Sequence, residues 1–155
     1  MKLYLSLLIL LMIAAVSPAF QTPAPSTIDP TGLWSVSFTL PSVGVKDLTL
    51  ACHANHTALF KLNDPGATDK SAVAGVPAVW SPISNGRIDV SGEVELPLGT
   101  CCREVGTLIL KGTSSSANAI SGKALFVGTT TDEENFNGFR SLTGTFTATR
   151  KSNKE

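Results

Sequence analysis

The segment with the strongest metal-ligand character contains Cys52, His53 and His56. A thiolate and imidazole nitrogens are ligands that zinc prefers, and Cys101 with Cys102 could complete such a site. The alternation of apolar residues predicts strands whose directions place the two cysteine groups at opposite ends of the domain. Adjacent cysteines on a strand also point to opposite faces. We therefore predict no metal site and no cofactor, and we expect both histidines to lie at a solvated tight turn.

Two glutamates, Glu93 and Glu95, have the separation of a glycosidase carboxylate pair. Residues two apart on a strand lie about 7 Å apart on one face, which is within the range of such pairs. Both glutamates alternate with apolar residues and share their face with Arg87 and Asp89. This arrangement is typical of a solvated outer surface rather than of a catalytic pair.

Two further groups of residues could carry chemistry. Residues 132–134, Asp-Glu-Glu, could bind calcium together with Asp64 and Asp69, but their spacing matches no EF-hand pattern. Ser-His-Asp catalysis finds no support, because neither histidine falls on an inward position and no Gly-x-Ser-x-Gly elbow is present. We therefore predict that the chain is not an enzyme.

The elements that position these residues are strands, because apolar residues recur at every second position and no window shows a sustained helical period. Turn residues separate the segments every ten to fifteen residues. The predicted strands are Leu33–Leu40, a strand through Leu48–Cys52, Thr57–Leu62, Val76–Ser81, a strand through Arg87–Leu96, Glu104–Lys111, Asn118–Val127 and Ser141–Arg150. Residues 112–117 are predicted to form a turn, and Pro77 and Pro82 make Val76–Ser81 the weakest strand.

An all-β chain of about eight consecutive strands suits an antiparallel up-and-down β-barrel, with a β-sandwich as the alternative. In a closed barrel with an even number of strands, the first strand pairs antiparallel with the last. Trp34 and Arg150 both face inward by alternation, so they would meet at one end. A guanidinium stacked on an indole contributes ~1–2 kcal/mol when desolvated. We therefore predict that these two residues form a structural latch.

The lengths of the connections predict two different ends of the barrel. The turns at the Trp34 end are short, whereas two connections at the other end, 63–75 and 128–139, are long. A closed base with a loop-rich mouth is the form of a small-molecule binder. Six apolar side chains are expected to line the interior: Phe38, Phe60, Trp80, Leu108, Phe126 and Phe146.

The segment Gly32-Leu33-Trp34, with Arg150 in the last strand, resembles the calycin superfamily, which includes lipocalins, fatty-acid-binding proteins and avidins. The resemblance implies a tryptophan that closes the barrel base under an arginine from the final strand, over roughly residues 31–151. The lipocalin Thr-Asp-Tyr motif and the biotin-binding residues of avidins are absent. The resemblance therefore implies a fold and leaves the ligand open.

The N-terminus has the features of a secretory signal peptide over residues 1–19: an early lysine, an apolar run and small residues before the expected cleavage site. The apolar run is shorter than the ~20 residues of a membrane span, so no span is expected after cleavage. We expect residues 20–30, rich in Pro, Thr and Ser, to form a flexible spacer. Residues 31–151 are expected to form the β-barrel domain and residues 152–155 a polar tail.

Composition and the leader together predict a secreted or periplasmic protein. The 155 residues suffice for one domain with its own core, and the formal net charge is zero. No basic run is present, so nucleic acid is not an expected partner. Export permits disulfides; with three cysteines, the candidates are a Cys101–Cys102 bridge or a bridge from Cys52 to one of that pair.

The function favoured by these observations is that of an exported, non-enzymatic protein that binds a small apolar ligand inside the barrel. The alternative is a cell-envelope or secreted interaction protein, or an inhibitor, with a solid core and an envelope or extracellular protein as its partner. The sequence leaves both open, because the same inward side chains would line a cavity or fill a core.

Overall fold

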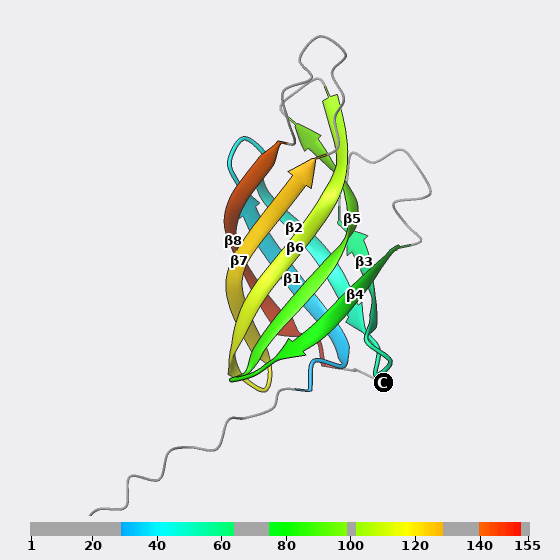
Figure 1. Cartoon of the computed structure of the whole chain (residues 1–155), viewed down its shortest axis with the longest axis vertical. Helices are drawn as coiled ribbons and strands as arrows, with labels where there is room; N and C mark the ends of the chain where they lie inside the picture. Colours follow the sequence, from blue (N-terminus) through cyan, green and yellow to red (C-terminus); the bar gives the residue numbers. More distant parts are fainter. Residues whose placement is uncertain (1–28, 64–74, 99–101, 129–139, 153–155) are drawn as a thin grey trace, which may run out of the picture.

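The chain folds into a closed barrel of antiparallel strands in which each strand pairs with the next (Figure 1). The computed structural model describes residues 29–63, 75–98, 102–128 and 140–152. The strands are β1 (Gly32–Leu40), β2 (Gly44–Cys52), β3 (Thr57–Leu62), β4 (Val76–Ile83), β5 (Arg87–Leu98), β6 (Cys102–Ser116), β7 (Ala119–Gly128) and β8 (Ser141–Arg150). The predicted all-β, eight-stranded up-and-down barrel is confirmed, and a sandwich is excluded.

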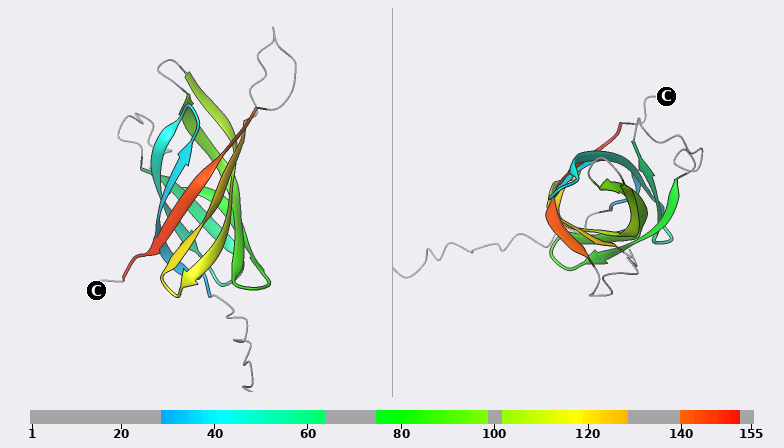
Figure 2. Two further views of the ribbon diagram at one scale, coloured as in Figure 1. Left: turned by 90° about the vertical axis from the view of Figure 1, so that its left-hand side faces the viewer. Right: turned by 90° about the horizontal axis from the view of Figure 1, so that it is seen from above.

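The barrel closes through its first and last strands. β1 and β8 pair antiparallel from Trp34 opposite Arg150 to Thr39 opposite Thr145. Seen from above, the strands form a continuous ring (Figure 2). The turns β2–β3, β4–β5 and β6–β7 lie at the base, beside the start of β1, and all three are short, as the sequence predicted.

The β4–β5 turn shows how local sequence sets the register. Asn85 and Gly86 both adopt positive φ, 64° and 71°, a pair of conformations for which Asn-Gly is the preferred sequence in a hairpin. The flanking residues Ile83 and Arg87 are register partners. The turn therefore fixes which face of β5 points inward.

The predicted turn at residues 112–117 is wrong, because β6 continues to Ser116. Gly112 is paired on both sides, with Ile88 of β5 and Gly122 of β7. The glycine and the serines that follow it looked like turn residues, but Gly112 belongs to two ladders, and Ser114 and Ser116 still have partners in β7. The reversal of the chain occurs only at Ala117 and Asn118.

Strand β4 tolerates two prolines because each has a ladder partner on one side only. Pro77 is the partner of Leu59 in β3 and has none in β5, whereas Pro82 is the partner of Ile88 in β5 and has none in β3. A proline lacks the N–H that a second ladder would use, so such positions accept it. β4 therefore extends to Ile83, two residues beyond the prediction.

The core consists of the inward side chains of all eight strands, and it includes every one of the six predicted interior residues. None of these six is more than 6% exposed.

Within the described residues, no helix is long and apolar enough to cross a bilayer. The expected leader, most of the expected spacer and residues 153–155 of the expected tail lie outside the described part of the chain.

Candidate functional site

The base of the barrel is closed by Trp34 and Arg150. The guanidinium carbon of Arg150 lies 4.5 Å from the centroid of the Trp34 ring. The indole is 1% exposed, and its Nε1–H donates to the carbonyl oxygen of Pro30 at 2.8 Å. The contact expected from strand directions is therefore present, and it adds a cation–π attraction to the burial of a large ring.

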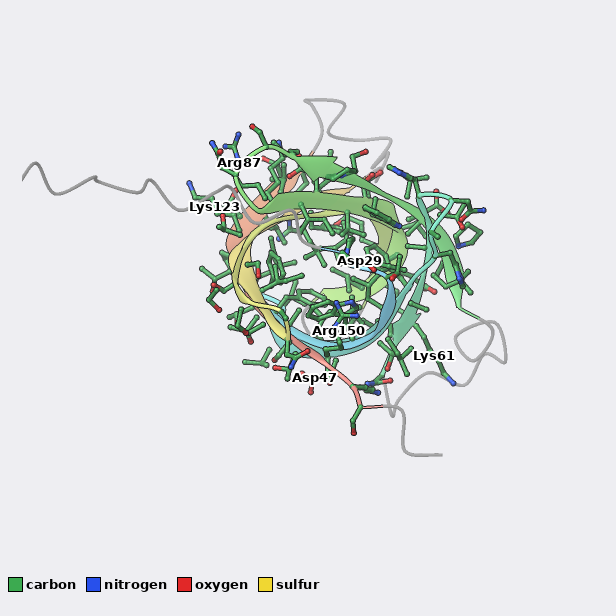
Figure 3. All side chains as sticks on the ribbon, turned by 90° about the horizontal axis from the view of Figure 1, so that it is seen from below. Asp29, Asp47, Lys61, Arg87, Lys123 and Arg150 are labelled. Carbon is green, nitrogen blue, oxygen red and sulfur yellow. The ribbon has the colours of Figure 1, made fainter. Side chains whose placement is uncertain are left out.

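The same guanidinium ties two chain segments to the base. Its Nε donates to the carbonyl oxygen of Ala117 at 3.2 Å, and its Nη2 donates to that of Asp29 at 2.6 Å. Its Nη1 donates to the carbonyl oxygen of Thr31. Viewed from below, Arg150 and Asp29 lie inside the outline of the barrel (Figure 3). One side chain thus satisfies carbonyls of the β6–β7 turn and of the segment before β1.

A second capped tryptophan lies at the base, on β4. The imidazole of His56 stacks on the indole of Trp80 with centroids 4.4 Å apart and an interplanar angle of 5°. The Nε1–H of Trp80 donates to the carbonyl oxygen of His53 at 2.8 Å. The β2–β3 turn, in which His56 has a φ of 67°, therefore covers the base rather than simply reversing the chain.

Cys52 lies at the base as a buried free thiol. It ends β2 opposite Gly32 of β1. Burial raises the pKa of the Cys52 thiol to about 12, against the smaller opposing effect of the Arg150 charge. The thiol is therefore protonated at neutral pH, which makes it a poor nucleophile and a poor metal ligand.

Three inward glycines of the barrel wall each lie directly against a phenylalanine ring of the core. A Cβ atom added at the glycine would lie 2.9 Å from the ring in the Gly92–Phe60 pair, 2.6 Å in the Gly106–Phe126 pair and 2.7 Å in the Gly112–Phe146 pair. Real Cβ atoms do not approach other atoms this closely, so each ring occupies space that only glycine leaves free. Three of the six predicted ligand-lining residues therefore pack against backbone.

The mouth end contains Glu104, the only charged residue that is buried among the described residues, with 2% exposure. It faces inward opposite Leu96, on the part of β5 and β6 that extends beyond their neighbours. Its carboxylate packs so closely on Gly128 that a Cβ there would overlap Oε1. A carboxylate held at this depth needs polar or charged neighbours, so this end of the interior differs chemically from the apolar middle.

Among the described residues, those proposed for other chemistry do not converge. Glu93 and Glu95 are exposed, and Glu95 Oε1 pairs with Arg103 Nε at 2.9 Å, as expected of an outer surface. No group of three potential metal ligands exists within the described residues. The acidic residues 132–134, Asp64, Asp69, Cys101 and the side chain of Cys102 lie outside the described part of the chain.

The sequence analysis missed two features of the interior and the base, the buried Glu104 and the stack of His56 on Trp80. The sequence contains a signal for the first. Counting back from Leu108 in steps of two places Glu104 on the inner face, so alternation alone marks it as a buried charge. The stack of His56 on Trp80 had no such signal, because it depends on how the β2–β3 turn folds under β4.

Comparisons with protein-family models, with curated proteins and with solved structures return no match to this chain.

Proposed function

We propose that the protein is an exported, non-enzymatic, calycin-like barrel whose interior is a packed core and which acts through its outer surface. The observation that carries the proposal is that the core side chains are at most 6% exposed and that three of their phenylalanine rings pack directly against inward glycines. Small barrels of about eight strands have interiors just wide enough for side chains to fill. The surface is then the part of the molecule available for recognition.

The closed base supports the same proposal. Trp34 and Trp80 are both capped, by Arg150 and His56, and both donate their ring N–H to backbone carbonyls. Because both indole N–H groups already have acceptors, neither is available to form a hydrogen bond to a ligand. The stack of Arg150 on Trp34 also supports the calycin resemblance, in which that pair serves the fold.

The test is a search for a ligand inside the barrel. The purified protein is titrated with an environment-sensitive apolar dye, and palmitate is added as a competitor. We expect no saturable dye signal and no small-molecule adduct in native mass spectrometry. Stoichiometric dye binding that palmitate reverses would overturn the packed-core proposal.

A second candidate function, a carrier for a small apolar ligand, is favoured by Glu104. A buried carboxylate at the loop-bearing end of an apolar interior is the kind of polar group that orients a ligand in a pocket. This candidate predicts that the dye binds and that Glu104→Gln changes its affinity. An unchanged affinity in that variant would remove Glu104 from the site.

A further inference from the structure

The outer face of the barrel places two lysines directly opposite one another. Lys111 of β6 and Lys123 of β7 are register partners, and both are exposed. The Cβ atoms of such partners lie ~4.5–5.5 Å apart, and like charges in this position destabilise a sheet. Proteins accept local losses of stability of this kind where a surface serves a function.

Arg87 adds a third cation beside this pair. It is the partner of Thr113, two residues along β6 from Lys111, and it is also exposed. Seen from below, Arg87 and Lys123 project into solvent on the side of the barrel away from Lys61 (Figure 3).

One carboxylate partly balances these charges. Asp89 Oδ2 lies 3.8 Å from Lys111 Nζ, at the long end of ion-pair distances. Arg87 and Lys123 form no ion pair with any described residue. The local charge is therefore positive, although the whole chain has a formal net charge of zero.

Hydroxyl-bearing residues adjoin the three cations along and across the strands. Thr113 is the partner of Ser121, Ser121 of Thr147, and Lys123 of Thr145. All these side chains are exposed, and none of the large exposed hydrophobic residues lies among them. We call this surface the basic face; its members are Arg87, Lys111, Thr113, Ser121, Lys123, Thr145 and Thr147.

We propose that the basic face binds an anionic polysaccharide. Ammonium and guanidinium groups donate charge-assisted hydrogen bonds to carboxylate or sulfate groups, and threonine and serine hydroxyls both donate to and accept from sugar hydroxyls. A single-stranded nucleic acid would instead need aromatic side chains for stacking, and the basic face has none. This inference rests on the proposed function, in which the outer surface is the recognition surface, but it can fail while the packed core stands.

The test compares charge reversals on two sides of the barrel. The purified protein is applied to immobilised polygalacturonate, to neutral dextran and to oligo(dT) at low salt. We expect saturable binding to polygalacturonate that weakens as salt is added, and no retention on dextran. Loss of one cation should weaken binding about fivefold, as for lysines near other anionic surfaces, and Lys123→Glu should weaken it further by repulsion.

Lys61→Glu is the matched control, since it makes the same change in net charge on an exposed residue of β3. It should leave polygalacturonate binding unchanged. Lys123→Glu should also leave thermal stability equal or higher, because it replaces a like-charge partner of Lys111 by an opposite one, which separates loss of binding from loss of folding. Equal weakening by both variants, tighter binding to oligo(dT), or no polyanion binding at all would overturn the proposal.

Discussion

Trp34 contributes to the base of the barrel in three ways. Its ring is buried, it lies under the Arg150 guanidinium, and it anchors Pro30 by a hydrogen bond. Trp34→Ala removes all three interactions and leaves a cavity that the closed strands cannot easily fill. We expect a loss of ~3–5 kcal/mol in the free energy of unfolding, measured by urea denaturation.

Leu33→Ala is the control for this substitution. Leu33 is the neighbour of Trp34 in the chain, but it faces outward and is 37% exposed. Its truncation should change stability by no more than ~0.5 kcal/mol. A Trp34→Ala protein as stable as the Leu33→Ala protein would show that the latch is not a stabilising feature.

Cys52 provides a second test of the base, through its reactivity. Because burial raises the pKa of its thiol to about 12, the native protein should expose neither the thiolate nor the sulfur to reagents. In a Cys101→Ser/Cys102→Ser background, an aromatic disulfide reagent at pH 8 should release no chromophore from the native protein and one equivalent after unfolding. Rapid reaction of the native protein would contradict the burial of this thiol.

The same raised pKa predicts a dependence of stability on alkaline pH. The folded thiol keeps its proton, while the unfolded thiol, whose pKa has the ordinary value of 9.0, loses it. The contribution to stability is therefore complete below pH 9 and is lost as pH rises towards 12. Comparison with Cys52→Val isolates the contribution of this thiol: the variant should show a shallower decline in stability.

At the scale of elements, strand type and inward face could be read from alternation, because period two survives wherever one face is buried. Strand ends could not be read in the same way. Gly112 signals a turn when taken alone, yet it is the position where the Phe146 ring of β8 packs against the backbone of β6. A contact between residues 34 positions apart in the chain overrides the local preference of a glycine, and sequence pattern does not contain that contact.

The proposed basic face shows a second limit of sequence pattern. Each cation of the basic face occupies an ordinary outward position, and alternation identifies all of them as solvated. What alternation does not give is register, which sets Lys111 opposite Lys123 and Arg87 opposite Thr113. Turn geometry and pairing across strands determine register, so this cluster could be recognised only in the folded barrel.

The glycine–phenylalanine pairs predict a specific coupling. In Gly112→Ala the new methyl group meets Ile120 Cγ2 at 2.5 Å and Phe146 Cζ at 2.7 Å. Overpacking of this kind costs ~1–3 kcal/mol, which exceeds the ~0.5–1 kcal/mol that alanine gains over glycine in a strand. We expect a net loss of stability in chemical denaturation.

The double variant Gly112→Ala/Phe146→Leu shows whether the ring causes that loss. A smaller side chain at Phe146 leaves room for the new methyl group, so the double variant should be more stable than the sum of the two single effects by at least ~0.5 kcal/mol. Strict additivity would mean that the ring does not fill the space above this glycine.

At the scale of the whole molecule, the barrel divides into three levels along its axis. The base is held by capped tryptophans, the core above it packs phenylalanine rings against glycines, and the mouth end contains the buried Glu104 carboxylate. All three levels depend on closure, because β1 and β7 would each lose a neighbour if β8 did not lie between them. Closure removes the exposed edges at which open sheets associate.

This dependence on closure predicts how the chain responds to cutting and rejoining. The two ends of the domain lie together at the base, where the Lys151 N–H donates to the carbonyl oxygen of Leu33 at 2.8 Å. A permutant in which a short glycine–serine linker joins residue 152 to residue 29, and which opens at Ser42 in the β1–β2 turn, keeps every strand pair. It should unfold cooperatively and retain the near-ultraviolet circular dichroism of both tryptophans.

A chain that ends at Gly128 is the opposite case, because it lacks β8 and with it Phe146, Ala148 and Arg150. It would leave one edge of β1 and one of β7 without partners and uncover Trp34, so it should lose the cooperative transition and the tryptophan signal. If closure of the barrel is the source of stability, the permutant must fold and the shorter chain must not fold. A folded short chain, or a permutant without cooperative unfolding, would mean that the β1–β8 seam does not hold the barrel together.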